Sequence, residues 1–248
     1  MNGCGQAGGT LLLSWLLLFA TAEAGEAPAP QQLRSFSAEY SLSSDYLELG
    51  RVKVELRLDS TGGYRYSALT MPVGLTAVLR RDEISEVSSG RVQSNRIVPE
   101  RYRYHHQGDD RLRLVELTFD WQQGRVTNSS SGSRWSMGVP HGTQDKFSQR
   151  LALMLAVAEG RQSVELPVAD GGRTKTYHFQ LLGEEMVDVE AGRYQTLKLE
   201  RSKDDRPSSV SLWLAPSLHY LPVMVKKRER DGLYWMQLRS VEWLDGEG

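Results

Sequence analysis

The sequence predicts a mainly β fold: a curved antiparallel sheet or a partly open β-barrel, with one amphipathic helix packed on its concave side. Three observations support this prediction. Apolar and polar residues alternate along most of the chain, clusters of Gly, Asp and Pro separate the alternating segments, and one segment alone has a helical period. Alternating segments with turn signals between them are typical of hairpins in an antiparallel meander or barrel.

Residues 51–58 show the alternation most clearly. Val52, Val54, Leu56 and Leu58 fall on one face of the predicted strand, and charged residues occupy the other face. Antiparallel sheets allow this pattern because one face can pack on a core while the other faces water. The further predicted strands are residues 36–42, 64–69, 78–87, 98–105, 112–121, 125–130, 162–168, 174–182, 194–201, 210–215, 221–228 and 234–243.

Residues 112–121 change phase within the segment. Leu112 and Leu114 share one face, whereas the alternate apolar residues from Val115 to Trp121 share the other. The sequence therefore predicts either a β-bulge between Leu114 and Val115 or a strand that crosses from one buried face to another. A bulge bends a sheet and helps to close a barrel.

Residues 145–159 have the other period. Apolar residues recur there at helical spacing, which predicts a helix of about four turns. Thr143 or Asp145 can cap its start, and Gly160 ends it. The helix is apolar on more than half of its circumference, so it is expected to be buried against the sheet. The stripe consists of Phe147, Leu151, Met154, Leu155 and Ala158.

The first 24 residues predict a signal peptide. The apolar run from Leu11 to Phe19 is nine residues long, too short to cross a bilayer, which needs about 20. Ala22 and Ala24 form an A-x-A cleavage site, so we expect cleavage after Ala24, a periplasmic location and no transmembrane span after processing. Residues 25–34 then form a flexible lead-in, and residues 35–245 form a single antiparallel β domain.

The composition excludes several classes of protein. The 248 residues carry 30 basic and 31 acidic side chains, so a nucleic-acid binder that works through a basic face is not expected. The single cysteine, Cys4, precedes the apolar run and leaves with the signal peptide. The mature chain therefore has no thiol for a disulfide, a zinc cage or a redox pair. No cofactor is predicted.

No catalytic or metal motif is present. The chain lacks the H-E-x-x-H, G-x-S-x-G and P-loop patterns, and its one G-x-G-x-x-G match, Gly3 to Gly8, lies within the predicted signal peptide and not after a strand. His105 and His106 are adjacent on a predicted strand and point to opposite faces, which disfavours a shared metal ion. An enzyme would require several of His105, His141, Asp145 and Glu185 to converge in one pocket. We therefore expect a protein that is not an enzyme.

Large apolar side chains are the candidate ligand-binding residues. Tryptophans and methionines lie at strand positions, at strand ends or on the helix, and such residues also line the concave face of small apolar-ligand carriers. Ordinary core packing is the alternative explanation for them. The candidate set is Met71, Leu75, Trp121, Trp135, Met154, Trp213, Trp235 and Met236.

Several short segments resemble a bacterial periplasmic family called domain of unknown function 3108. They are Gln144-Asp-Lys-Phe-Ser148 before the helix, Ala191-Gly-Arg-Tyr-Gln-Thr196, Leu212-Trp-Leu-Ala215 with Leu221-Pro-Val223, and the pattern from Tyr40 to Gly50. The resemblance spans residues 36–238. It implies a secreted, mostly antiparallel β protein of a Gram-negative-type bacterium, whose shape resembles the half-barrels of periplasmic lipoprotein carriers. It supplies no catalytic residues.

Two functions remain open from the sequence. The first is a non-enzymatic periplasmic protein that binds or carries an apolar ligand (a lipid, an acyl chain or a lipoprotein tail) in a cavity between the curved sheet and the helix. The alternative is an envelope assembly or structural protein with a filled core, which acts through a surface patch or a sheet edge. The expected partner is accordingly an apolar small molecule or lipid, or an envelope protein. The sequence does not give the oligomeric state.

Overall fold

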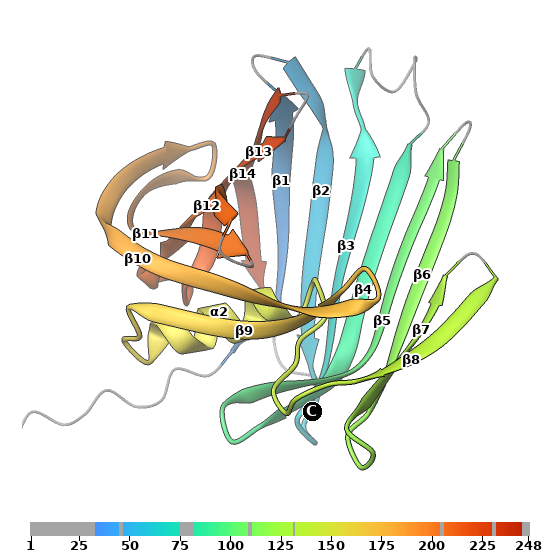
Figure 1. Ribbon diagram of the computed structural model, residues 1–248. Coiled ribbons are helices and arrows are strands. Elements are labelled where there is room, and N and C mark those ends of the chain that lie inside the picture. The colour runs from blue at the N-terminus through green and yellow to red at the C-terminus, as the bar shows by residue number, and fades with distance from the viewer. Residues whose placement is uncertain are drawn as a thin grey trace, which may run out of the picture.

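The computed structural model describes residues 33–44, 47–74, 82–108, 111–130, 132–203, 206–229 and 232–244 (Figure 1). The helical elements are α2 (Gln149–Ala158) and a short 3-10 helix, η1 (Pro216–Leu218). The strands are β1 (Phe36–Ser44), β2 (Leu47–Leu58), β3 (Gly63–Pro72), β4 (Glu83–Gln93), β5 (Arg96–Gly108), β6 (Arg111–Asp120), β7 (Arg125–Ser130), β8 (Ser133–Gly138), β9 (Ser163–Asp170), β10 (Arg173–Val189), β11 (Gly192–Lys203), β12 (Arg206–Ala215), β13 (Leu221–Glu229) and β14 (Gly232–Trp243).

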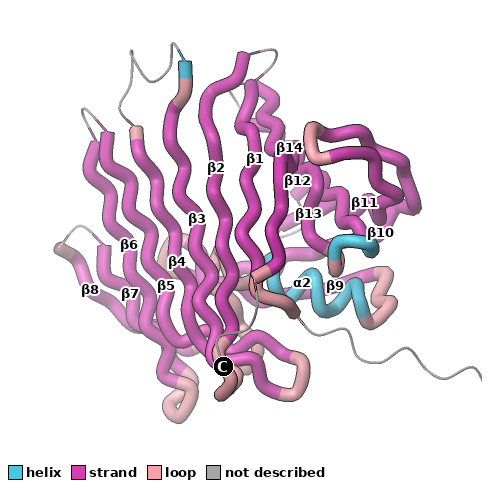
Figure 2. Tube along the Cα trace, turned by 180° about the vertical axis from the view of Figure 1, so that it is seen from behind, coloured by secondary structure: helices cyan, strands magenta, loops and turns pink. Residues whose placement is uncertain are grey.

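The strands form one antiparallel sheet in the order β8-β7-β6-β5-β4-β3-β2-β1-β14-β13-β12-β11-β10-β9. Two meanders, β1 to β8 and β9 to β14, join where β1 pairs with β14. Figure 2 shows the first meander as a tall wall and the second curling away from it. The sheet is curved but not closed, and α2 lies within its curve, so the predicted fold class is confirmed.

The helix divides the interior into two apolar clusters. Phe147, Leu151 and Leu155 belong to a cluster formed by the first meander together with residues of the second, among them Val223 and Leu238. Leu153 and Val157, on another side of the helix, pack with β9 to β12. A helix that is apolar on most of its surface can pack against both halves of a curved sheet at once.

The helix begins one turn later than the sequence predicts. The Asp145 carboxylate accepts hydrogen bonds from the backbone N–H groups of Phe147 and Ser148, both at 2.7 Å, and the Ser148 hydroxyl accepts from the Asp145 N–H at 3.0 Å. This reciprocal pattern resembles a capping box but closes the turn before the helix: the N-cap of α2 is Ser148, whose side chain makes no capping hydrogen bond, so the predicted cap at Thr143 or Asp145 is wrong. Gly160, with φ of +81°, ends the helix as predicted.

The segment between β8 and α2 connects the two ends of the sheet. Gln144 forms a parallel bridge with Val168 of the edge strand β9, and its side-chain amide donates to the carbonyl oxygen of Ile97 on β5 at 2.9 Å. The ring of Trp135 on β8 also lies against Gly172, in the turn between β9 and β10. The open sheet is therefore fastened across its gap without a direct pairing of β8 and β9.

The bulge predicted between Leu114 and Val115 is absent, and that prediction is wrong. β6 pairs with β5 and β7 without any shift of register. The apolar pattern of β6 changes phase because the strand extends beyond the edge of the core: Leu117 and Phe119 are buried, whereas Leu112 is 74% exposed. The irregularities that accompany the curvature lie in other strands, for example between Ser89 and Gly90 of β4.

Some predictions lie outside the described residues. These are the signal peptide at residues 1–24, most of the lead-in at residues 25–34, and the candidate site residue Leu75. Within the described ranges, no helix is both long and apolar enough to span a membrane.

The bulge at Gly90 predicts a strong effect of a single methyl group. A Cβ atom at Gly90 would lie 2.1 Å from the Val98 carbonyl oxygen and 2.8 Å from the Pro99 Cα, both backbone atoms of β5. Gly90→Ala is expected to lower the free energy of unfolding by about 1–3 kcal/mol because the strands must separate. Denaturant unfolding followed by circular dichroism measures this effect.

Gly138→Ala is the matched control, since a Cβ at that position meets nothing within 4 Å. Its effect should stay within about 0.5 kcal/mol. Equal stabilities of the two variants would contradict the close approach of β4 and β5.

Candidate functional site

A cavity of about 700 Å³ lies on the concave side of the sheet, next to the first turn of α2. Strands of both meanders and the helix contribute to its wall. Its lining residues are seven apolar side chains, four tyrosines, seven charged side chains and one amide: Val54, Phe179, Val210, Leu212, Pro222, Val225, Met236; Tyr40, Tyr66, Tyr104, Tyr177; Glu86, Lys146, Arg150, Asp170, Arg201, Lys227, Glu229; and Gln149. The lining is therefore amphipathic rather than uniformly apolar.

The strand register separates an apolar row of the wall from a charged one. Leu212, Val225 and Met236 are register partners across β12, β13 and β14. A second row lies two residues further along the same strands. It consists of Arg201 of β11, Val210 of β12 and Lys227 of β13, which are also register partners. Residues i and i+2 of a strand share a face and are about 7 Å apart. A ligand that spans both rows would contact apolar surface at one end and cations at the other.

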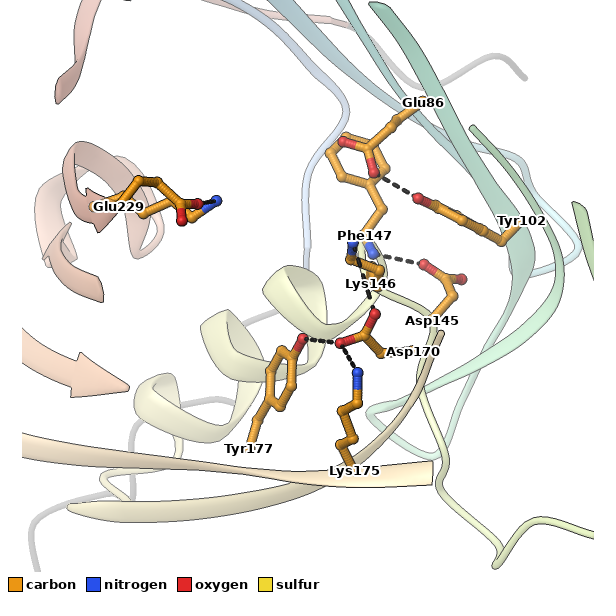
Figure 3. A network of polar contacts seen from close by, with 10 residues as sticks. Glu86, Tyr102, Asp145, Lys146, Phe147, Asp170, Lys175, Tyr177 and Glu229 are labelled. Atoms are coloured by element: carbon orange, nitrogen blue, oxygen red, sulfur yellow. Dashed lines mark hydrogen bonds and ion pairs between the residues drawn. The ribbon is translucent and has the colours of Figure 1, made fainter. Parts of the chain in front are cut away.

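Asp170 is the centre of a cation cluster at the rim of the cavity. Its carboxylate binds Lys175 at 2.7 Å and Lys146 at 3.8 Å, and it accepts a hydrogen bond from the Tyr177 hydroxyl at 3.3 Å. Figure 3 shows these three side chains converging on Asp170 beside the start of α2. The negative charge of Asp170 is thus already compensated by two lysines.

Two arginines face the cavity without a carboxylate partner. Arg150, on α2, lies over the Phe147 ring, and Arg201, on β11, lies over the Tyr177 ring at 4.6 Å. Among the described residues neither guanidinium forms an ion pair, and the Arg201 Nε is buried without a hydrogen-bond partner. Burial lowers the pKa of Arg201; Tyr177, Asp170 and Glu229 oppose this shift, and the positive charge of Arg150 adds to it.

Asp145 is fully buried behind the cavity, at the start of the helix. Besides its hydrogen bonds within the turn before the helix, it accepts a hydrogen bond from Ser88 on β4 at 2.6 Å, and the Ser88 hydroxyl is 3.0 Å from that of Tyr64. Burial raises the pKa of Asp145 from its usual 3.8 to about 6, because the carboxylate loses its hydration and the hydrogen bonds compensate only in part.

Of the predicted ligand-binding residues, Met236 alone lines this cavity. Met71 and Trp135 are exposed, at 42% and 38%. Trp121 stacks on Phe119, and Trp235 lies under Lys226. Met154 and Trp213 are buried, the latter with its indole N–H donating to Glu185. Leu75 lies outside the described residues. The predicted set is therefore not brought together around one space.

Tyrosines and arginines line the space instead. Tyr40 and Tyr66 occupy inward-facing positions of strands in which buried and exposed residues alternate. A tyrosine is fully buried less often than an aliphatic residue, so such a position indicates a candidate site residue. Arg150 is the one charged residue of α2. Both signals are present in the sequence, and a search for polar residues at inward positions would have found them.

The candidate acid–base residues have separate partners. Asp145 contacts Ser88, Glu185 contacts Trp213 and Lys198, and the exposed His141 stacks on Trp121. His105 lies on β5 opposite Leu114. Among the described residues, no group of three His, Cys, Asp or Glu side chains could hold a metal ion.

These observations define a class of protein: an open, barrel-like antiparallel β protein with a helix inside its curve and an amphipathic cavity beside that helix. A family model described as "Protein of unknown function (DUF3108)" matches residues 35–239, so the chain belongs to the DUF3108 family. The resemblance stated from the sequence is thereby confirmed. The comparison with curated proteins gives no significant match.

Solved structures share the architecture at low sequence identity. A β-barrel-like protein of the unknown-function family DUF1849 from Brucella abortus aligns with a TM-score of 0.59 and 13% identity, over 86% of this chain and 99% of that one. MucB aligns with a TM-score of 0.35 and 11% identity, over 88% and 56% of the two chains. A putative exported protein with a YmcC-like fold from Bacteroides fragilis gives 0.33 and 8%, over 85% and 96%. The first of these supports the fold alone.

The buried carboxylate predicts a pH-dependent stability. Because the pKa of Asp145 is higher in the folded state, the folded protein keeps a proton that the unfolded chain has already released between about pH 4 and 6. The stabilisation from this proton is fully present below pH 4 and is lost as the pH rises through 6, by about 3 kcal/mol in total. In Asp145→Asn this contribution to the pH dependence should disappear, as measured by denaturant unfolding from pH 4 to 7.

The asparagine side chain keeps the shape of the carboxyl group and can donate to Ser88, so the Asp145→Asn variant is expected to fold. Asp188→Asn is the control, since the Asp188 side chain is 76% exposed, and it should retain the pH dependence of the wild type. A slope in Asp145→Asn equal to that of the wild type would rule out titration of Asp145 in this range.

Proposed function

We propose that this protein is a non-enzymatic periplasmic protein that binds or carries an apolar ligand, such as a lipid, an acyl chain or a lipoprotein tail, in the cavity between the sheet and α2. The observation that carries the proposal is the volume of about 700 Å³ with an apolar row on its wall. Small-molecule sites typically enclose about 300–1,000 Å³. The predicted signal peptide at residues 1–24 supports the periplasmic location.

The wall offers a continuous apolar surface to such a ligand. Leu212, Val225 and Met236 are cross-strand neighbours, and Phe179 and Val54 add apolar area from other strands. Each methylene that leaves water for this surface contributes about 0.8 kcal/mol. The cost of immobilising the ligand offsets part of that gain.

The cavity also bears on the alternative function. An envelope assembly or structural protein that acts through a surface patch or sheet edge needs only a filled core. The space beside α2 is lined by side chains from both meanders, and an interior of this kind supports binding within the sheet over that alternative.

Filling the cavity should weaken binding. Val225 is half-buried and lies at the centre of the apolar row, so Val225→Phe places a ring in the space that the ligand would occupy. The affinity for the uncharged fluorophore N-phenyl-1-naphthylamine is expected to fall about tenfold or more. Fluorescence titration measures it, and native mass spectrometry of gently purified wild type should show a co-purified small molecule.

Val241→Phe is the matched control because Val241 is also a half-buried valine but does not line the cavity. It should bind the fluorophore as the wild type does. Wild-type protein that purifies empty and binds no apolar fluorophore would overturn the proposal.

Export predicts a defined mature terminus. If the signal peptide is cleaved after Ala24, protein recovered from the periplasm begins at Gly25. Intact-mass measurement of the periplasmic fraction tests this, and a chain that keeps residues 1–24 and stays in the cytoplasm would contradict it.

A further inference from the structure

The charges on the cavity wall do not balance locally. Each of the three lining carboxylates already has a partner: Asp170 binds two lysines, Glu229 pairs with Lys227, and Glu86 accepts a hydrogen bond from the Tyr102 hydroxyl at 2.7 Å. Arg150 and Arg201 are left without an ion pair among the described residues. Both arginines are half-buried, and a charge that is partly removed from water is normally paired or bound to a ligand, because its desolvation is costly.

Both guanidinium groups are held in a way that leaves hydrogen-bond donors available. Aromatic faces fix them, Phe147 for Arg150 and Tyr177 for Arg201. A cation–π contact uses the face of the guanidinium, whereas its five N–H donors point outward in the guanidinium plane. The Arg201 Nε is buried with no acceptor among the described residues. An anionic oxygen in the cavity would supply that acceptor.

The position of Arg201 in the sheet defines the distance between the cationic row and the apolar row. Its register partners Phe179 and Val210 also line the cavity, and Leu212 lies two residues beyond Val210 on the same face of β12. The distance from the cationic row to the apolar row is therefore about 7 Å. This spacing fits a headgroup and the first carbons of its chain.

We propose that the ligand of this cavity is an anionic amphipath, whose carboxylate or phosphate headgroup binds Arg150 and Arg201 while its chain lies along Leu212, Val225 and Met236. The proposal rests on the proposed function, since it names the chemical class of the ligand in the same cavity. The headgroup lies on the β11 side, away from the carboxylate of Glu86, which is held at Tyr102 on β5. Arginine suits such headgroups because it binds two oxygens of one anion at once.

The experiment compares two ligands that differ only in the headgroup. Decyl phosphate and decanol are titrated as competitors of N-phenyl-1-naphthylamine, and inorganic phosphate serves as the free anion. We expect decyl phosphate to bind at least about tenfold tighter than decanol, since charge-assisted hydrogen bonds are the stronger ones. Millimolar inorganic phosphate should not compete, because it lacks the chain.

Single variants locate the headgroup. Arg150→Gln and Arg201→Gln should each weaken decyl phosphate binding about tenfold and leave decanol binding within about twofold, so unchanged decanol binding also shows that the variant folds. Arg193→Gln on β11 and Arg161→Gln after α2 are the matched controls, because both arginines are exposed and pair with a neighbouring carboxylate. Both controls should bind the two ligands as the wild type does.

The outcomes separate the two proposals. Equal affinities for decyl phosphate and decanol, with both cavity variants unchanged, would overturn the headgroup assignment and leave the apolar-ligand function standing. Inorganic phosphate that binds as tightly as decyl phosphate would replace the amphipath by a free anion. If neither decyl compound nor the apolar fluorophore binds, the proposed function itself is overturned.

Discussion

The fold depends on one short segment, Gln144 to Ser148, whose residues hold the start of the helix against β3, β4, β5 and β9. The Asp145 carboxylate holds the turn before the helix through the backbone N–H groups of Phe147 and Ser148 and accepts a hydrogen bond from Ser88 of β4. The neighbouring Gln144 bridges the edge strand β9 and β5. Phe147 then stacks on Tyr66 of β3, with ring centroids 4.0 Å apart. This segment therefore joins the end strand β9 and the inner strands β3, β4 and β5 to the start of the helix.

The same segment explains why a space remains inside. A sheet that closed on itself with so many strands would enclose a wide interior, and one helix of ten residues fills only part of the present one. The helix packs against both apolar clusters with its side chains from Leu151 to Val157. Its first turn, with Gln149 and Arg150, borders the unfilled part. Within α2 the cavity is lined by Gln149 and Arg150, so it lies beside the polar first turn of the helix and not along the apolar side chains that follow.

Most of the fold could be predicted from the sequence, because alternation reports directly which residues face inward. Val52, Val54 and Leu56 are buried as their spacing requires, and the helical period of residues 147–158 and Gly160 locate α2 to within one turn.

The site could be predicted only in part, since alternation shows that Tyr66 and Trp213 are buried but not which of them borders empty space. That depends on which strands face each other, and on the strand order, which places β3 and β11 on opposite sides of one cavity. The phase change at Leu112 was misleading for a related reason: an apolar residue beyond the end of the core imitates a second buried face.

The composition of the cavity wall is difficult to explain by stability alone. Arg150 and Arg201 are half-buried on the cavity wall, where apolar side chains would avoid the cost of partly desolvating a charge. Instead two guanidinium groups line the same cavity, and burial, with a smaller contribution from the positive charge of Arg150, lowers the pKa of Arg201. The tyrosine and phenylalanine rings beneath them reduce that cost without supplying an anionic acceptor. An anion between the two arginines would remove the repulsion, so the energetic cost that the fold carries at this point favours the binding of an anionic ligand.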